Sequence, residues 1–168
     1  IGMNAMNSFT MKCLTELGYD YIMPSPELTG VQLASIAEHS ALAGRMIIGI
    51  HGRTPLMQLL HCPIKEHKGC QNCMGIAGAV TDEAGRVFPL VNIRYPDNCL
   101  VRMLNCRTTD LIDLFDRIPQ TAGYVLNFVG EQIDEVTERI AAANEAMNGK
   151  RQTQYPNSTR GHWVRKVE

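Results

Sequence analysis

The stretch Arg45-Met46-Ile47-Ile48-Gly49-Ile50 indicates the fold class of this chain. Its apolar residues are consecutive rather than alternating, which is typical of a parallel strand covered by helices on both faces. His51-Gly52-Arg53 follows at the carboxyl end of that strand, where parallel sheets form their active sites. We therefore expect an α/β fold and take His51 and Arg53 as candidate catalytic residues. A histidine that satisfies a loop carbonyl would give the same pattern.

Two helical segments and a short strand precede this stretch. Thr29 and Gln32 form the T-x-x-Q of a capping box, which predicts a helix from there to Gly44. Asn7 or Ser8 can cap an earlier helix, and residues 19–23 read as a short strand. The order helix, strand, helix, strand over residues 1–54 is typical of βα units in a parallel sheet. The expected inward positions of the two helices are Phe9, Cys13, Leu17, Leu33, Ile36, Ala37 and Ala41.

Glu27 is a further candidate catalytic residue. It follows Ser25-Pro26 directly after the expected strand, so it could bind substrate or act as an acid or base. A carboxylate that stabilises the dipole at the entry of the next helix would explain it equally well.

Length and charge limit the classes of protein. The 168 residues suit one domain and are too few for a complete (β/α)₈ barrel, which needs about 250. Sixteen Lys and Arg against seventeen Asp and Glu give a net charge of -1, so any contact with RNA would be local. No run approaches the roughly 20 apolar residues that cross a bilayer, and no leader segment is recognisable. We expect a soluble, cytoplasmic protein with no membrane contact.

The densest chemical signal is the spacing C-x7-C-x2-C-x25-C of Cys62, Cys70, Cys73 and Cys99, within a cysteine-rich metal or cluster segment with a β-hairpin at residues 55–107. Thiolates two residues apart can bind one metal ion, and four thiolates suit tetrahedral zinc or an iron–sulfur cluster. The spacing does not separate these two. Reduced buried cysteines are an alternative, and disulfides are a weaker one. Cys106 is a reserve ligand.

For the remaining cysteine and three of the histidines, structural or surface roles are also to be considered. Cys13 is expected in the core. His61 and His67 flank Cys62 and are either alternative ligands, partners of ligands or exposed loop residues. His39 is expected at the surface.

The later chain predicts a hairpin and a final helix–strand–helix unit. Residues 79–81 and 87–91 flank Asp82-Glu83-Ala84-Gly85, which is typical of a β-hairpin turn. Thr109 can cap a short helix with Asp110 in its first turn, and residues 123–129 read as a strand. The next helix, within the 108–149 unit, ends at Gly149, and residues 150–168 form a basic polar tail. The expected buried face of that helix consists of Ile133, Val136, Ile140 and Met147.

Several motifs together resemble one family. They are His51-Gly52-Arg53, Pro55-Leu56-Met57, Cys62-Pro63-Ile64, Gly69-Cys70-Gln71-Asn72-Cys73, the hairpin from Asp82 to Pro89, Ser25-Pro26-Glu27-Leu28, Cys99 with Asn105, and Thr159-Arg160-Gly161-His162-Trp163. This combination is similar to the collagenase-like peptidases of family U-thirty-two. Departures from the family pattern are Thr81, Glu83, Arg165-Lys166 and Cys106.

The resemblance implies a partial (β/α) barrel-like parallel sheet, of which this chain is the later half, with a cysteine-rich insertion and a β-hairpin. It also implies that Cys62, Cys70, Cys73 and Cys99 hold a four-iron four-sulfur cluster. Members carry the label peptidase, while others are implicated in oxygen-independent hydroxylation of RNA bases or of a quinone precursor. Three functions are therefore alternatives. The first is a peptidase with structural cysteines, and the second is a cluster-dependent hydroxylase component that acts on RNA or a quinone precursor. The third is a non-catalytic binding module that a metal ion stabilises. The open sheet edge is expected to be covered by a second copy or by the missing N-terminal barrel half.

Overall fold

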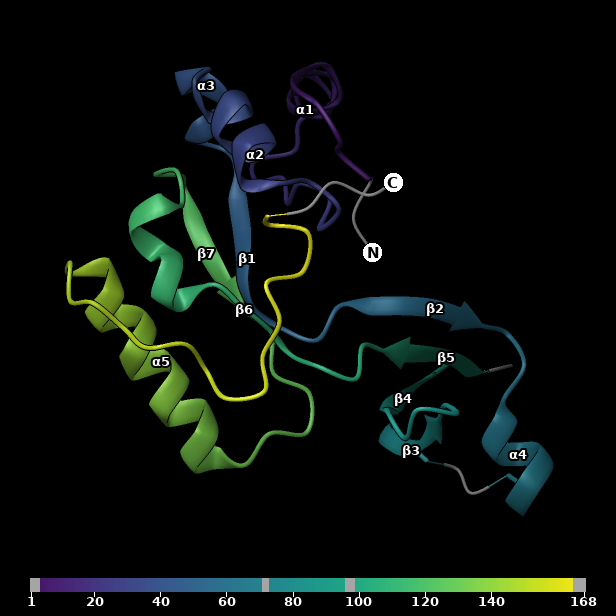
Figure 1. Ribbon diagram of the computed structural model, residues 1–168. Coiled ribbons are helices and arrows are strands. Elements are labelled where there is room, and N and C mark those ends of the chain that lie inside the picture. Colours follow the sequence, from purple (N-terminus) through teal and green to yellow (C-terminus); the bar gives the residue numbers. More distant parts are fainter. Residues whose placement is uncertain (1–3, 71–72, 96–98, 165–168) are drawn as a thin grey trace.

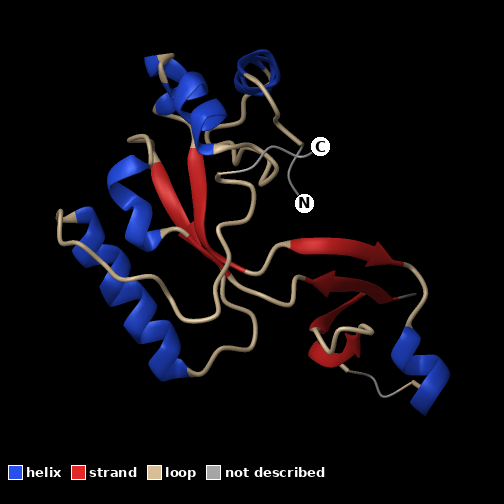
Figure 2. Cartoon of the chain, viewed as in Figure 1, coloured by secondary structure: helices blue, strands red, loops and turns tan. Residues whose placement is uncertain are grey.

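The computed structural model describes residues 4–70, 73–95 and 99–164 and arranges them around two sheets (Figure 1). The first sheet has the strand order β6-β1-β7, with β1 (Ile47–Gly52), β6 (Thr109–Asp110) and β7 (Gly123–Leu126). The second has the order β2-β5-β4-β3, with β2 (Pro55–Leu59), β3 (Gly75–Thr81), β4 (Val87–Arg94) and β5 (Cys99–Leu104). Figure 2 shows most of the helices gathered around the first sheet. A mixed α/β fold is therefore confirmed.

The first sheet is mixed, with one parallel and one antiparallel pair of strands. β1 pairs with β7 in parallel, and isolated parallel bridges join Ile22 to Met46 and Ala5 to Pro24. Only these bridges form where a strand was expected at residues 19–23, because Pro24 has no N–H to extend a ladder. The described strands do not close into a barrel. The barrel-like arrangement stays a prediction, which the succession of parallel neighbours supports.

Helix α1 (Ser8–Glu16) begins as expected but buries a different face. The Asn7 side chain caps it by accepting a hydrogen bond from the Thr10 backbone N–H at 2.9 Å. Met11 and Leu14 are buried, whereas Phe9, Cys13 and Leu17 are exposed. The prediction that Cys13 lies in the core is therefore wrong, because the helix contacts the core through the stripe spaced three residues apart. The apolar residues spaced four apart lie on the other side.

The capping box at Thr29 is confirmed. The Thr29 hydroxyl accepts from the backbone N–H of Gln32 at 3.3 Å, and the Gln32 carboxamide oxygen accepts from the Thr29 N–H at 2.9 Å. The helix is shorter than predicted: α2 (Gly30–Ala37) is followed by a separate turn, α3 (Ser40–Ala43), because His39 adopts an extended conformation. This break brings Leu42 into the core in place of Ala41.

Helix α5 (Ile133–Met147) ends at Gly149, which has a φ of 81°, but its buried face was predicted wrongly. Arg139, Ala142, Ala143 and Ala146 are buried, while Ile133, Ile140 and Met147 are exposed. Alanines let the helix backbone approach the 3₁₀ helix η1 (Ile112–Arg117) closely, which larger side chains would prevent.

The segment before η1 differs from the prediction. Thr109 and Asp110 form strand β6, which pairs antiparallel with the end of β1, so Thr109 does not cap a helix. The Asp110 carboxylate accepts from the Ile112 N–H at 3.2 Å and begins the 3₁₀ turn instead. The strand expected at residues 123–129 is confirmed as far as Leu126.

The second sheet contains the predicted hairpin of β3 and β4. The Asp82 carboxylate closes its turn by accepting from the backbone N–H groups of Ala84 at 3.0 Å and Arg86 at 2.9 Å. The irregular stretch between residues 55 and 78 contains strand β2 and the short helix α4 (Pro63–Lys68).

The tail folds back on the first sheet instead of extending into solvent. The Thr159 N–H donates to the Thr108 carbonyl at 2.8 Å, and the Gly30 N–H donates to the Trp163 carbonyl at 3.0 Å. A Cβ on Gly30 would lie 2.6 Å from the Trp163 ring, so glycine permits this contact. Arg165-Lys166, like Gln71-Asn72, lies outside the described residues. None of the described helices is long and apolar enough to cross a membrane.

Candidate functional site

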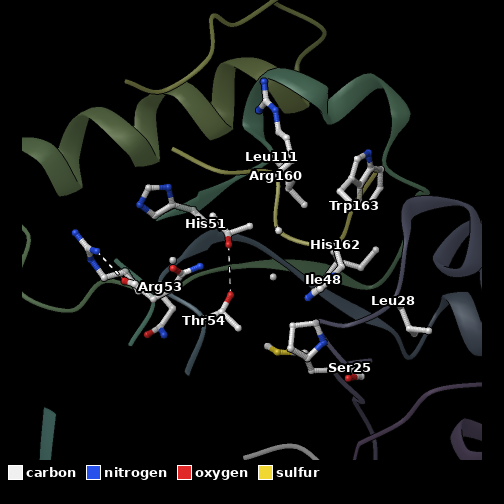
Figure 3. A pocket seen from close by; sticks show the side chains of 18 of the residues that line it. Ser25, Leu28, Ile48, His51, Arg53, Thr54, Leu111, Arg160, His162 and Trp163 are labelled. Atoms are coloured by element: carbon white, nitrogen blue, oxygen red, sulfur yellow. Dashed lines mark hydrogen bonds between the residues drawn. The ribbon is translucent and has the colours of Figure 1, made fainter. Parts of the chain in front are cut away.

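A cavity of about 250 Å³ lies at the carboxyl end of β1, where the sequence predicts an active site (Figure 3). Its wall combines the loop before α2, the end of β1, the loop after β5 and the tail. Gly52 allows this approach, because its φ is 140° and a Cβ would lie 2.7 Å from the Asn127 carbonyl oxygen. The polar residues that line the cavity are Ser25, His51, Arg53, Thr54, Asn105, Thr109, Asn127, Arg160 and His162.

His51 forms a buried pair with Asp110. Its Nδ1 lies 2.6 Å from the Asp110 Oδ2, and the two side chains are 1% and 0% exposed. The ring lies between Phe128 and Tyr155, at centroid distances of 5.1 and 5.7 Å. A carboxylate on Nδ1 fixes the orientation of the imidazole ring.

The His51 ring points away from Ser25 and Leu28, which lie on the opposite side of the cavity (Figure 3). The pair forms part of the cavity wall, and the His51 side chain presents almost no exposed surface there. Asp110 is a residue that the sequence did not single out for the site, because its pairing with His51 depends on a register between β1 and β6 that no local pattern reveals.

Tyr155 links this pair to α5. The guanidinium carbon of Arg139 lies 4.4 Å from the Tyr155 ring centroid, which is a cation–π contact. Burial, followed by the negative charge of Glu135, raises the pKa of Tyr155 above its usual value of 10.0. The phenol therefore stays protonated beside His51 at neutral pH.

Arg53 connects β1 to the loop after β5. Its Nη1 donates to the carbonyl oxygens of Asn105 at 2.9 Å and Cys106 at 2.7 Å. Arg160, unlike Arg53, forms an ion pair, because both of its terminal nitrogens donate to the Asp113 carboxylate. Glu27 is exposed and is not among the residues that line the cavity. The structure thus brings His51 and Arg53 together with the tail, and it places Glu27 apart from them.

The strand registers place the four predicted cysteine ligands at one end of the second sheet. Figure 1 shows this sheet and α4 to one side of β1. Leu59 pairs with Val101, so Cys62 follows β2 at the end where Cys99 begins β5. Gly75 pairs with Asn92, and Arg94 pairs with Cys99, so Cys73 precedes β3 at this same end. Cys70 lies between α4 and β3, in the connection that crosses this end.

Asn92 contacts one of these sulfurs. This residue is 4% exposed, and its Nδ2 donates to the Cys73 Sγ at 2.8 Å. Its carbonyl oxygen Oδ1 is buried without a hydrogen-bond partner in the described structure. An amide N–H that donates to sulfur is a contact that can orient a metal-bound cysteine ligand.

The four cysteines have the side-chain type that binds a metal ion or cluster through thiolates, and the backbone brings them to the same end of the sheet. Among the described residues, however, no three His, Cys, Asp or Glu side chains converge on a common point as a metal site requires. His61 and His67 are exposed, and the His61 Nε2 lies 3.3 Å from a Glu66 carboxylate oxygen. His39 is exposed, as predicted.

Cys106 lies at the other end of β5. At a rise of about 3.3 Å per residue, β5 places Cys106 roughly 20 Å from Cys99. This separation argues against Cys106 as a reserve ligand, and its carbonyl contacts Arg53 instead.

No protein-family model matches the chain, and neither a curated protein nor a solved structure matches it.

Proposed function

We propose that this chain is a cysteine-ligated metal protein of the kind found in the collagenase-like peptidase family U-thirty-two. In this proposal Cys62, Cys70, Cys73 and Cys99 hold a four-iron four-sulfur cluster, and the protein is a component of a hydroxylase that acts on RNA bases or a quinone precursor. The observation that carries the proposal is the gathering of all four cysteines at one end of the second sheet. Such a cluster, when bound, supplies one-electron transfer.

In this proposal one end of the second sheet would hold the cluster, and the other end would lie beside the substrate site. Asn92 would hold the Cys73 sulfur in place through its N–H. At the opposite end, the polar cavity beside β1 would bind the substrate, with Arg53 and the tail as its walls. The buried His51–Asp110 pair would keep that wall rigid.

A peptidase, which the family label implies, is the second candidate. The His51–Asp110 contact favours it, because a carboxylate that orients an imidazole is part of the machinery of many hydrolases. The His51 ring is buried between Phe128 and Tyr155, however, and is only 1% exposed to a substrate. The same cysteines could instead hold zinc as a structural staple.

The assembly and location belong to the same proposal. A second copy or an N-terminal barrel half would cover the open edge of β7. Free thiolate ligands require a reducing compartment, for which the cytoplasm is the natural choice.

Metal analysis with cysteine variants tests this function. The full chain is prepared without oxygen, incubated with ferrous iron and sulfide, desalted, and analysed for iron, sulfide and zinc. We expect cluster stoichiometry in the unchanged chain and in the controls Cys13→Ser and Cys106→Ser, and loss of most iron in Cys62→Ser, Cys73→Ser and Cys99→Ser. One zinc per chain with neither iron nor sulfide would exclude the cluster.

A further inference from the structure

A second cavity, of about 370 Å³, shares Arg53 with the candidate site. The turn of the β3–β4 hairpin, the loop after β5 and the start of the tail form its walls. Its volume falls in the range of small-ligand sites, which begins at about 300 Å³.

Three arginines line this cavity, namely Arg53, Arg86 and Arg107, and its described lining contains no carboxylate. Arg86 is paired with Asp82 at 2.7 Å. The Arg53 contacts on Nη1 are neutral carbonyls, and neither Arg53 nor Arg107 forms an ion pair within the described part of the chain. Two guanidinium groups thus retain their positive charge toward the cavity, although the whole chain has a net charge of -1.

Neutral hydrogen-bonding groups complete the lining. Thr108, Tyr155 and Asn157 also line the cavity, and their side chains carry a hydroxyl, a phenol and a carboxamide. Because the pKa of Tyr155 is raised by burial, the phenol stays neutral and adds no repulsion for an anion. Forked guanidinium donors with hydroxyl neighbours match the geometry of a phosphate group.

We propose that this cavity, the arginine pocket of Arg53, Arg86 and Arg107, binds the phosphate group of a ligand. The phosphate can be free, a terminal monoester or an internal diester, since all three present the same oxygens to the arginines. Arg53 lines both this pocket and the cavity at β1, so a ligand anchored here by its phosphate would extend toward the candidate site. Phosphate binding in this pocket needs no metal, so the test of this proposal is independent of the test for the cluster.

Binding of three phosphate probes to the full chain tests the proposal. Inorganic phosphate, adenosine monophosphate and a dinucleoside phosphodiester are titrated by calorimetry at low ionic strength, with sodium chloride as the ionic-strength control. We expect saturable binding of at least one probe. Tighter binding of the monophosphate identifies a terminal phosphate as the preferred source, and tighter binding of the dinucleotide identifies a diester.

Arginine variants locate the binding. Arg107 is exposed and without an ion pair, so Arg107→Gln should fold normally, and Arg86→Gln provides a second variant. Each should weaken binding about tenfold or more, since a hydrogen bond to a charged group is lost. Arg151→Gln changes an exposed arginine outside the pocket and should bind as the unchanged chain does. The proposal is overturned if no probe saturates, or if Arg151→Gln weakens binding as much as Arg107→Gln does.

Discussion

Replacement of Asp110 by alanine should be among the most destabilising single changes in the chain. Asp110 is fully buried, and its carboxylate bonds the His51 ring at 2.6 Å and the Ile112 N–H at 3.2 Å. Its backbone also accepts from the Arg160 guanidinium at 2.9 Å and donates to the Thr159 carbonyl at 3.0 Å. Alanine keeps only the two backbone contacts. Removing one partner of a buried pair costs about 3–5 kcal/mol, and an uncapped buried N–H adds about 1 kcal/mol or more.

This loss is a large fraction of the 5–15 kcal/mol that stabilises a typical domain. Urea unfolding followed by circular dichroism measures it as a fall in the midpoint at constant slope. Asp20→Ala is the matched control, because Asp20 is 89% exposed in its side chain and its pair with Arg45 spans 3.9 Å. The control should change the free energy of unfolding by less than about 0.5 kcal/mol.

A double-mutant cycle with His51→Ala isolates the pair itself. We expect a coupling energy of about 1.5–3 kcal/mol between His51 and Asp110. Additive effects of the two changes, or an Asp110→Ala variant no less stable than Asp20→Ala, would refute the reasoning that this pair orders the cavity wall.

Three further outcomes are expected. Gly52→Ala should cost about 2 kcal/mol or more in urea unfolding, because alanine is strained at a φ of 140° and its Cβ would meet the Asn127 carbonyl; an unchanged midpoint would contradict this close approach. Gly30→Ala should shift the fluorescence of Trp163, the single tryptophan, to longer wavelength as the ring leaves its site, and an unchanged spectrum would show that the tail does not pack there. The pKa of Tyr155 is raised in the folded chain, so its contribution to stability is complete below about pH 10 and is lost as the pH rises through the folded value. Between about pH 9 and pH 11, roughly one unit on either side of the usual pKa, the free energy of unfolding of a Tyr155→Phe variant should therefore fall less than that of the unchanged chain. Equal losses of stability would contradict the assignment.

Three local signals in the sequence predicted a helix start, a turn and a helix end correctly. The capping box at Thr29, the Asp82 turn and the stop at Gly149 each depend on residues within a few positions of one another, and each is observed. The strand with His51 at its carboxyl end was predicted for the same reason, since a run of apolar residues is a local pattern.

Helix faces were predicted less well, because periodicity identifies an apolar stripe but not the element that covers it. In α1 the core-facing residues are Met11 and Leu14 rather than the exposed Phe9, and in α5 three alanines face the core while the larger apolar side chains lie outward. Exposed positions such as Phe9 at 81% and Ile133 at 76% lie where no other described element packs on the helix.

The site was predictable only in part. His51 and Arg53 were identified by their place after the strand, whereas Asp110 joins them through pairing across 59 positions of sequence. The arginine pocket is invisible in the sequence for the same reason, because its arginines come from three separate loops.

The cluster proposal is decided by the Mössbauer spectrum of the full chain reconstituted without oxygen with isotopically enriched iron and sulfide. The account predicts the signature of a four-iron four-sulfur cluster at one per chain, unchanged in Cys106→Ser and lost in Cys73→Ser, whose sulfur Asn92 contacts. Iron bound equally by both variants, or a chain that takes up only zinc, would contradict it.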